Sequence, residues 1–129
     1  MKRLIAALAL WVLGMGLAPA QGSPAEAIVM DYYGALKAGD VDAVRALIGE
    51  PLAGQYQVLL TENTQYPEIL RAHYDGSTGE VVGSGSSAEG EASVDFEVMF
   101  KDGTKSTLRF NLRGQVDGSW KIVEEERVN

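Results

Sequence analysis

The sequence predicts an α+β fold, in which three to four N-terminal helices pack on the concave face of a curved four-stranded antiparallel meander. Two observations predict it. Apolar residues recur at helical spacing as far as Tyr74, and beyond it they alternate along segments that are separated by three similar tripeptides. Each tripeptide ends in glycine, the residue that best tolerates positive φ at a turn: Ala88-Glu89-Gly90, Lys101-Asp102-Gly103 and Val116-Asp117-Gly118.

The tripeptides also predict the register of the sheet. Three-residue loops pair Ser87 with Glu91, Phe100 with Thr104 and Gln115 with Ser119, so that even-numbered residues face even-numbered residues. A two-residue turn would instead place Phe100 opposite Lys105 and bury a charge. The face expected to meet the helices consists of Val82, Ala92, Val94, Phe96, Val98, Phe100, Leu108, Phe110, Leu112, Trp120 and Ile122, with Glu80 and Glu124 at its ends.

The first two helices have clear start and stop signals. Residues 23–26 read Ser-Pro-Ala-Glu, which is a capping box with proline at the first helical position. Gly39 is placed to end this helix, and Asp40 can cap the second, which stops at Gly49. We therefore expect a helical hairpin.

Two shorter helices should follow. Pro51 can open a third helix that runs to about Glu62. Because Pro67 disfavours the helical region for the residue before it, the chain should break near residues 63–66. A fourth helix then ends at Asp75-Gly76, and a Gly-rich segment leads into an edge strand that begins at Glu80.

The N-terminus predicts export. Residues 1–20 contain a basic start, an apolar run from Leu4 to Leu17 and the small-residue cleavage site Ala18-Pro19-Ala20, which together are typical of a signal peptide. We expect cleavage after Ala20, a periplasmic or extracellular location and no stable membrane insertion afterwards. Residues 21–129 should form one domain.

Charge and composition narrow the classes of partner. The chain has no cysteine, which excludes disulfides and thiolate chemistry. Without Lys2 and Arg3 it carries 9 basic and 18 acidic residues, a net charge of −9, so nucleic acid is not expected as a partner.

The order of elements resembles the nuclear-transport-factor-2-like superfamily, whose cystatin-like cone also occurs in SnoaL-like cyclases and ketosteroid isomerases. The resemblance is carried by residues 39–44, Gly-Asp-Val-Asp-Ala-Val, at the start of the second helix, and by residues 117–122, Asp-Gly-Ser-Trp-Lys-Ile, entering the last strand. It covers residues 24–125 and is strongest to exported members of unknown function. It implies helices folded over a concave sheet, often with a pocket at the open end, and it does not imply an activity.

Glu124, His73 and Tyr32 are the candidates for acid/base catalysis. The predicted pairing sets Glu124 opposite Phe110 on the helix-facing side, although a solvated position at the rim is the alternative interpretation. His73 lies within one turn of Leu70 on the fourth helix, where a histidine is usually a rim or hydrogen-bonded core residue.

Tyr32, Tyr56, Tyr74 and Phe110 are the candidates for ligand binding. Tyrosines at helical spacing also serve as core residues with a hydrated hydroxyl, and that alternative stays open. We expect no cofactor and no metal, because there is one histidine and because the consecutive residues 124–126 of a strand point to alternate faces and cannot converge on a cation.

These observations favour an exported, non-catalytic binding or interaction module with a small hydrophobic pocket. Its partner would be a small molecule or an envelope protein, and a dimer is left open. The alternative is a small-molecule lyase or isomerase that uses acid/base catalysis in the pocket of the cone. Polar groups converging on an enclosed space would favour the enzyme, and a filled cone would favour the module.

Overall fold

Four helices precede four strands in this computed structural model, which describes residues 23–88 and 90–128. The predicted signal peptide, residues 1–20, lies outside these ranges. The helices are α1 (Pro24–Ala38), α2 (Val41–Leu47), α3 (Leu52–Glu62) and α4 (Tyr66–Tyr74). The strands are β1 (Thr78–Ala88), β2 (Glu91–Met99), β3 (Lys105–Gly114) and β4 (Trp120–Arg127). No helix within the described ranges is long and apolar enough to cross a membrane.

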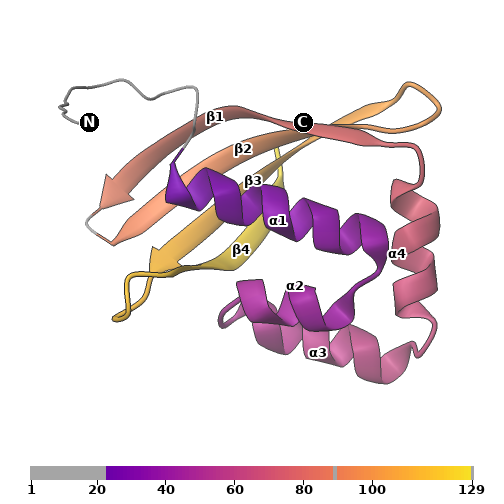
Figure 1. Cartoon of the computed structure of the whole chain (residues 1–129), viewed down its shortest axis with the longest axis horizontal. Coiled ribbons are helices and arrows are strands. Elements are labelled where there is room, and N and C mark those ends of the chain that lie inside the picture. Colours follow the sequence, from indigo (N-terminus) through magenta and orange to yellow (C-terminus); the bar gives the residue numbers. More distant parts are fainter. Residues whose placement is uncertain (1–22, 89, 129) are drawn as a thin grey trace, which may run out of the picture.

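The strands form one antiparallel sheet in the order β1-β2-β3-β4, and the helices lie against one of its faces, which we call the inner face (Figure 1). Helix α1 runs along the sheet and contacts β1, β2 and β4, while α2 and α3 lie on the side of β4. Helix α4 packs against α1. This arrangement confirms the predicted α+β class and the predicted meander.

Local capping interactions place the first two helices where the sequence predicts them. The Ser23 hydroxyl accepts a hydrogen bond from the Glu26 amide at 3.2 Å, and Asp40 accepts one from the Ala43 amide at 3.1 Å. Gly39 adopts φ +66° between the two helices, a conformation that glycine reaches without strain.

The register of β2 and β3 is the predicted one. Val94 pairs with Phe110 on the inner face, and Asp95 pairs with Arg109 on the opposite, outer face, where Arg109 Nε donates to Asp95 Oδ1 at 2.8 Å. The hairpin after β2 closes through the Phe100 amide, which donates to the Thr104 carbonyl at 2.8 Å, as a three-residue loop requires.

In β1, Ser84 pairs with Val94 as the predicted register requires, but the pairing shifts before Gly83. Val81 pairs with Phe96 and Gly83 with Asp95, so Val82 is an extra residue in a β-bulge. Val82 was expected on the inner face, yet it is 51% exposed. Because the bulge reverses side-chain parity, Glu80 pairs with Glu97 on the outer face.

The first hairpin also differs from the prediction. Ala88, rather than Ser87, pairs with Glu91. Gly90 has φ +79°, as a tight turn at this place requires.

A second bulge changes the last strand. Leu112 pairs with Ile122, whereas Asn111 pairs with Glu124, so Val123 is the extra residue. The expectation that Glu124 faces the helices opposite Phe110 is therefore wrong: Glu125 takes that place. Arg109 correspondingly lies opposite Glu126.

The core lies between the inner face and the helices. Its fully buried side chains include Val29, Val44, Val94, Phe96, Val98, Leu112 and Ile122. Trp120 packs against this core as predicted, opposite Gly114, but it is half-buried. A Cβ atom at Gly114 would lie 3.7 Å from the indole ring.

Gly79 is a position where the core leaves no room for a side chain. A Cβ atom there would lie 2.5 Å from Cζ of the buried Phe96 and 3.1 Å from the Tyr33 ring. We expect Gly79→Ala to lower the free energy of unfolding by about 1–3 kcal/mol, as overpacking does. Gly83→Ala, in the same strand with its nearest contact at 3.7 Å, should not be destabilising. Urea denaturation of both variants checks this, and equal midpoints would contradict the packing described here.

Candidate functional site

A hydrogen bond between α1 and β4 marks the candidate site. The Tyr32 hydroxyl donates to Glu125 Oε1 at 3.1 Å. Phe110, the cross-strand partner of Glu125, meets the Tyr32 ring edge-on with 5.5 Å between ring centroids. Tyr32 and Phe110 are buried, being 4% and 2% exposed. A carboxylate is thus held against aromatic rings at the edge of the core.

Glu125 lies in two environments at once. The residue as a whole is exposed, while its carboxylate is close to the buried Tyr32 and Phe110. Loss of water around the carboxylate raises the pKa of Glu125 above its ordinary value, and the hydrogen bond from Tyr32 opposes that rise. Burial, followed by the charge and hydrogen bonding of Glu125, raises the pKa of Tyr32 strongly.

Two tyrosines of α4, Tyr66 and Tyr74, interact electrostatically with the same carboxylate. Burial is the larger cause of the raised pKa of Tyr66 and of Tyr74, and the charge of Glu125 is the next. Neither phenol hydroxyl has a hydrogen-bond partner among residues 23–88 and 90–128. Tyr66 also meets Tyr56 of α3, with 5.8 Å between ring centroids. Side chains from α1 and α4 therefore interact with Glu125 of β4.

Two buried hydroxyls on the inside of the fold are unpaired. Within the part of the chain that the structure describes, Tyr56 Oη and Ser106 Oγ have no hydrogen-bond partner, although their residues are only 4% and 8% exposed. Burial raises the pKa of Tyr56 to about 12. Leaving a buried hydroxyl without a partner costs about 1–3 kcal/mol. A water molecule or a ligand at these hydroxyls would remove that cost.

The structure separates the three catalytic candidates. Only Tyr32 lies at the site. Glu124 is on the outer face, where it accepts a hydrogen bond from Asn111 Nδ2 at 3.1 Å. His73 is exposed, and its ring meets Tyr74 edge-on and Phe100 at a tilt, with centroid distances of 4.8 and 4.9 Å.

The four ligand-binding candidates have different neighbours. Tyr32 donates a hydrogen bond to Glu125, and Phe110 is the cross-strand partner of Glu125. Tyr74 is buried between Tyr33 and Phe100, and only its electrostatic interaction connects it to Glu125. Tyr56 contacts the ring of Tyr66 and has no ring contact with the other three candidates among the described residues.

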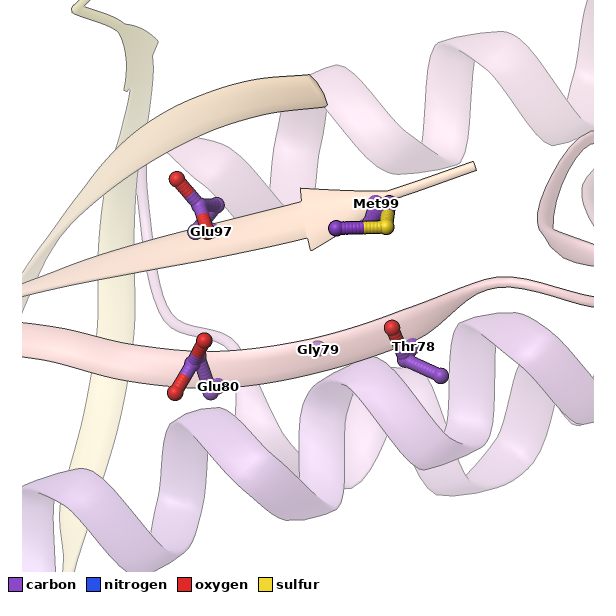
Figure 2. A pocket seen from close by; sticks show the side chains of 5 residues that line it. All are labelled: Thr78, Gly79, Glu80, Glu97 and Met99. Atoms are coloured by element: carbon purple, nitrogen blue, oxygen red, sulfur yellow. The ribbon is translucent and has the colours of Figure 1, made fainter. Parts of the chain in front are cut away.

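Several surface hollows lie away from this site. One of about 220 Å³ is lined by Thr78, Gly79, Glu80, Glu97 and Met99 at the edge formed by β1 and β2 (Figure 2). Glu80 and Glu97 lie on adjacent strands there, as Figure 2 shows, so two like charges are opposed. No group of three or more acidic or histidine side chains that could hold a metal occurs among the described residues.

Another hollow, of about 400 Å³, contains His73. It is bordered by Asp75, Phe100, Lys101 and Asp102, and Lys101 Nζ lies 3.1 Å from Asp75 Oδ2. Both partners of this ion pair are exposed, so it contributes at most about 1 kcal/mol to stability. His73 is therefore part of a solvated surface.

Glu125 is the functional candidate that sequence reasoning missed. The signal is the pair Ile122-Val123: two adjacent apolar residues cannot both enter one face of a regular strand. Ile122 is 0% and Val123 7% exposed, because Val123 turns towards Gly49 in the connection between α2 and α3. An apolar pair followed by three glutamates could have suggested the bulge.

Two solved structures are similar to this chain. A protein from Shewanella frigidimarina, described as a "putative ketosteroid isomerase", is 17% identical with a TM-score of 0.57, and the match covers 83% of this chain and 96% of that one. A nuclear-transport-factor-2-like protein of unknown function from Shewanella baltica is 14% identical with a TM-score of 0.58, covering 88% and 98%. No model of a protein family matches the sequence, and no curated protein matches it.

Removing the Tyr32 hydroxyl should raise the pKa of Glu125 further. The hydrogen bond from Tyr32 stabilises the ionised carboxylate and is the one influence that lowers this pKa. A ¹³C NMR titration of the Glu125 carboxyl group in Tyr32→Phe checks this. Tyr33→Phe is the control, because the Tyr33 hydroxyl pairs with Ser77 instead. An unchanged or lower Glu125 pKa in Tyr32→Phe would show that the bond is not made in solution.

Neutralising Glu125 should stabilise the protein near pH 7. A carboxyl group whose pKa is raised in the folded state favours folding while protonated, and this contribution is lost as pH rises through the folded pKa. Glu125→Gln keeps an acceptor for Tyr32 and removes the charge. Its free energy of unfolding at pH 7 should therefore exceed that of the parent, by less than about 1 kcal/mol because solvent screens the group. Below pH of about 4 the difference should vanish.

Glu124→Gln removes the same charge from the outer face and is the matched control. Thermal unfolding at pH 7 and pH 3.5 provides the comparison. An equal gain in both variants would mean that overall net charge, and not burial of Glu125, determines the effect.

Proposed function

We propose that this chain, which has the nuclear-transport-factor-2-like fold, is an exported, non-catalytic binding module that holds a small molecule beside Tyr32 and Glu125. The fold itself is the one that the sequence resemblance predicted, and the similar solved structures bear it out. Fold alone assigns no activity, so the proposal depends on the site.

The unpaired polar groups are the observation that carries the proposal. The Tyr56 hydroxyl is buried and has no hydrogen-bond partner among the described residues. Buried polar groups in folded proteins are nearly always hydrogen-bonded. An unpaired phenol hydroxyl on α3 and a carboxylate on β4 that is hydrogen-bonded to Tyr32 are polar groups that a small ligand would bind.

The absence of a paired acid and base favours binding over catalysis. The sequence suggested Glu124 with His73, and these side chains lie on the outer face and on a solvated surface of α4, away from Tyr32. Glu125 is a single carboxylate, and its neighbours Tyr32 and Phe110 are a phenol with a strongly raised pKa and a hydrocarbon ring. A phenol that resists ionisation orients a ligand more readily than it accepts a proton.

A second candidate is an isomerase or lyase in which Glu125 acts as the base. The raised pKa of Glu125 and the phenol next to it favour this reading, since such tuning supports acid/base chemistry. One similar solved structure is described as a "putative ketosteroid isomerase". At 17% identity that description cannot be carried over to this chain.

Export is supported by the sequence pattern of residues 1–20. A module of this kind would meet its ligand or an envelope protein outside the cytoplasm. Its formal net charge of −7 makes nucleic acid an unfavourable partner.

Native mass spectrometry of the protein purified from its own envelope tests the proposal. We expect a mass above that of the processed chain, in which a small molecule is retained and is released on denaturation. Tyr56→Phe, which removes one unpaired hydroxyl, should retain the same compound at lower occupancy. A chain that carries nothing, or a compound recovered in chemically altered form after incubation, would contradict a non-catalytic binding module.

A further inference from the structure

We propose that the free edge of β1 is a docking site for an extended segment of another protein that carries lysine or arginine and pairs with β1 as an additional strand of the sheet. The free edge is the side of β1 that faces away from β2. This inference goes beyond the small-molecule proposal, because it concerns a different surface and a different kind of partner.

The two outer strands of the sheet differ in what covers them. On β4, Ile48 bridges Ile122, and the Gly49 amide donates to the Ile122 carbonyl at 2.8 Å. β1 is the other outer strand, at the upper border of the sheet in Figure 1, and its only strand partner within residues 23–88 and 90–128 is β2. Its free edge therefore presents backbone groups with which an added strand can pair.

The sequence of β1 lacks the usual protection against such pairing. Edge strands commonly carry charged residues or proline, and residues 81–88 contain neither. β1 does have the bulge at Val82, which is another protective device, but the valine side chain there is 51% exposed. An added strand that covers this apolar side chain would gain from its removal from water.

Gly83 and Gly85 of β1 are not required by the fold. Neither has a positive φ, a Cβ atom at Gly83 would lie 3.7 Å from its nearest neighbour, and a Cβ atom at Gly85 would have no atom within 4 Å. Gly79 in the same strand differs, because a Cβ atom there would overlap Phe96. Glycine weakens a strand, and where packing does not demand it, it marks a place that another backbone or a ligand can approach closely.

The missing side chains also leave a hollow on the outer face. Its volume is about 580 Å³, and it extends from the two glycines to Arg109 of β3 and Glu126 of β4. Asp95 lies in it, held by Arg109, whose Nε and Nη2 donate to the two carboxylate oxygens at 2.8 and 3.2 Å. A side chain of an added strand can pass over the glycines into this hollow.

The charge of the outer face beside β1 indicates which segment fits. The hollow contains the carboxylates of Asp95 and Glu126 and one guanidinium group. Glu80 pairs with Glu97 across β1 and β2 (Figure 2); Glu97 has Lys105 at 4.0 Å, whereas Glu80 forms no ion pair among the described residues. A lysine or arginine on the added strand would complement this acidic surface.

A second copy of this chain suits the free edge less well. Glu80 is the one charged residue in β1, so a second β1 would bring another negative charge and no positive one. The chain is also acidic as a whole, with a formal net charge of −7, which opposes self-association.

Three short capped peptides test the inference in ¹H–¹⁵N NMR titrations of the processed protein at low salt. The first alternates lysine with valine, the second has glutamate in place of lysine, and the third keeps the lysines and has proline in place of valine. The first should shift the amide signals of Val82, Gly83 and Gly85, but not that of Ile122 on the covered edge. It should bind about tenfold more tightly than the glutamate peptide. The proline peptide has the same charge but cannot form a strand, so it should not bind.

Gly85→Lys should weaken binding of the lysine–valine peptide about tenfold, because it places a positive charge at the free edge. The open space around Gly85 accommodates the new side chain without a change of fold. Gly34→Lys is the matched control: Gly34 lies on the exposed side of α1, a Cβ atom there also has no atom within 4 Å, and the variant gains the same charge. It should bind the peptide as the parent does.

Three results would overturn the inference. Equal binding of the lysine–valine and proline peptides would show a general attraction to an acidic protein, and no binding, or shifts confined to other elements, would exclude the free edge of β1. A dimer whose β1 amides are protected from hydrogen exchange without any peptide would show that a second copy occupies the edge. None of these results bears on the small molecule, which native mass spectrometry tests separately.

Discussion

One extra residue in the last strand determines which acidic side chain this fold turns inward. Val123 is inserted between the pairs Leu112 with Ile122 and Asn111 with Glu124. The bulge is held by the connection between α2 and α3, where Ile48 bridges Ile122 and the Gly49 amide donates to the Ile122 carbonyl at 2.8 Å. This connection covers the edge of β4, which would otherwise expose unpaired backbone groups. The bulge therefore serves packing and, through side-chain parity, also places the site.

The position of Glu125 lowers the stability of the folded protein when its carboxylate is ionised. A carboxylate beside Tyr32 and Phe110 loses part of its hydration, and its raised pKa reflects this loss. The unpaired hydroxyl of Tyr56 adds to the same imbalance. Polar groups that lower stability are typical of sites that bind or react, because function and maximal stability impose different demands.

Sequence reasoning reached the parts of the fold that depend on local interactions. Both ends of α1 and the start of α2 follow from Ser23, Gly39 and Asp40, whose caps involve residues no more than five positions away. The two bulges could not be predicted in the same way. Whether Val123 leaves the ladder depends on Gly49, more than seventy residues away, and alternation alone cannot show it. Side-chain parity reverses at each bulge. The prediction that Glu124 faces the helices was therefore wrong by one residue, because Glu125 occupies that place.

The central claim, that the bulge at Val123 brings Glu125 and not Glu124 to Tyr32, is tested most directly by a ¹³C-edited NOESY spectrum. Contacts between the side-chain protons of Glu125 and the Tyr32 ring, together with contacts between Glu124 and Asn111, are the result that the structure predicts. Contacts between Glu124 and the Tyr32 ring would contradict it, because they would mean that β4 continues without a bulge and that the site is built around a different glutamate.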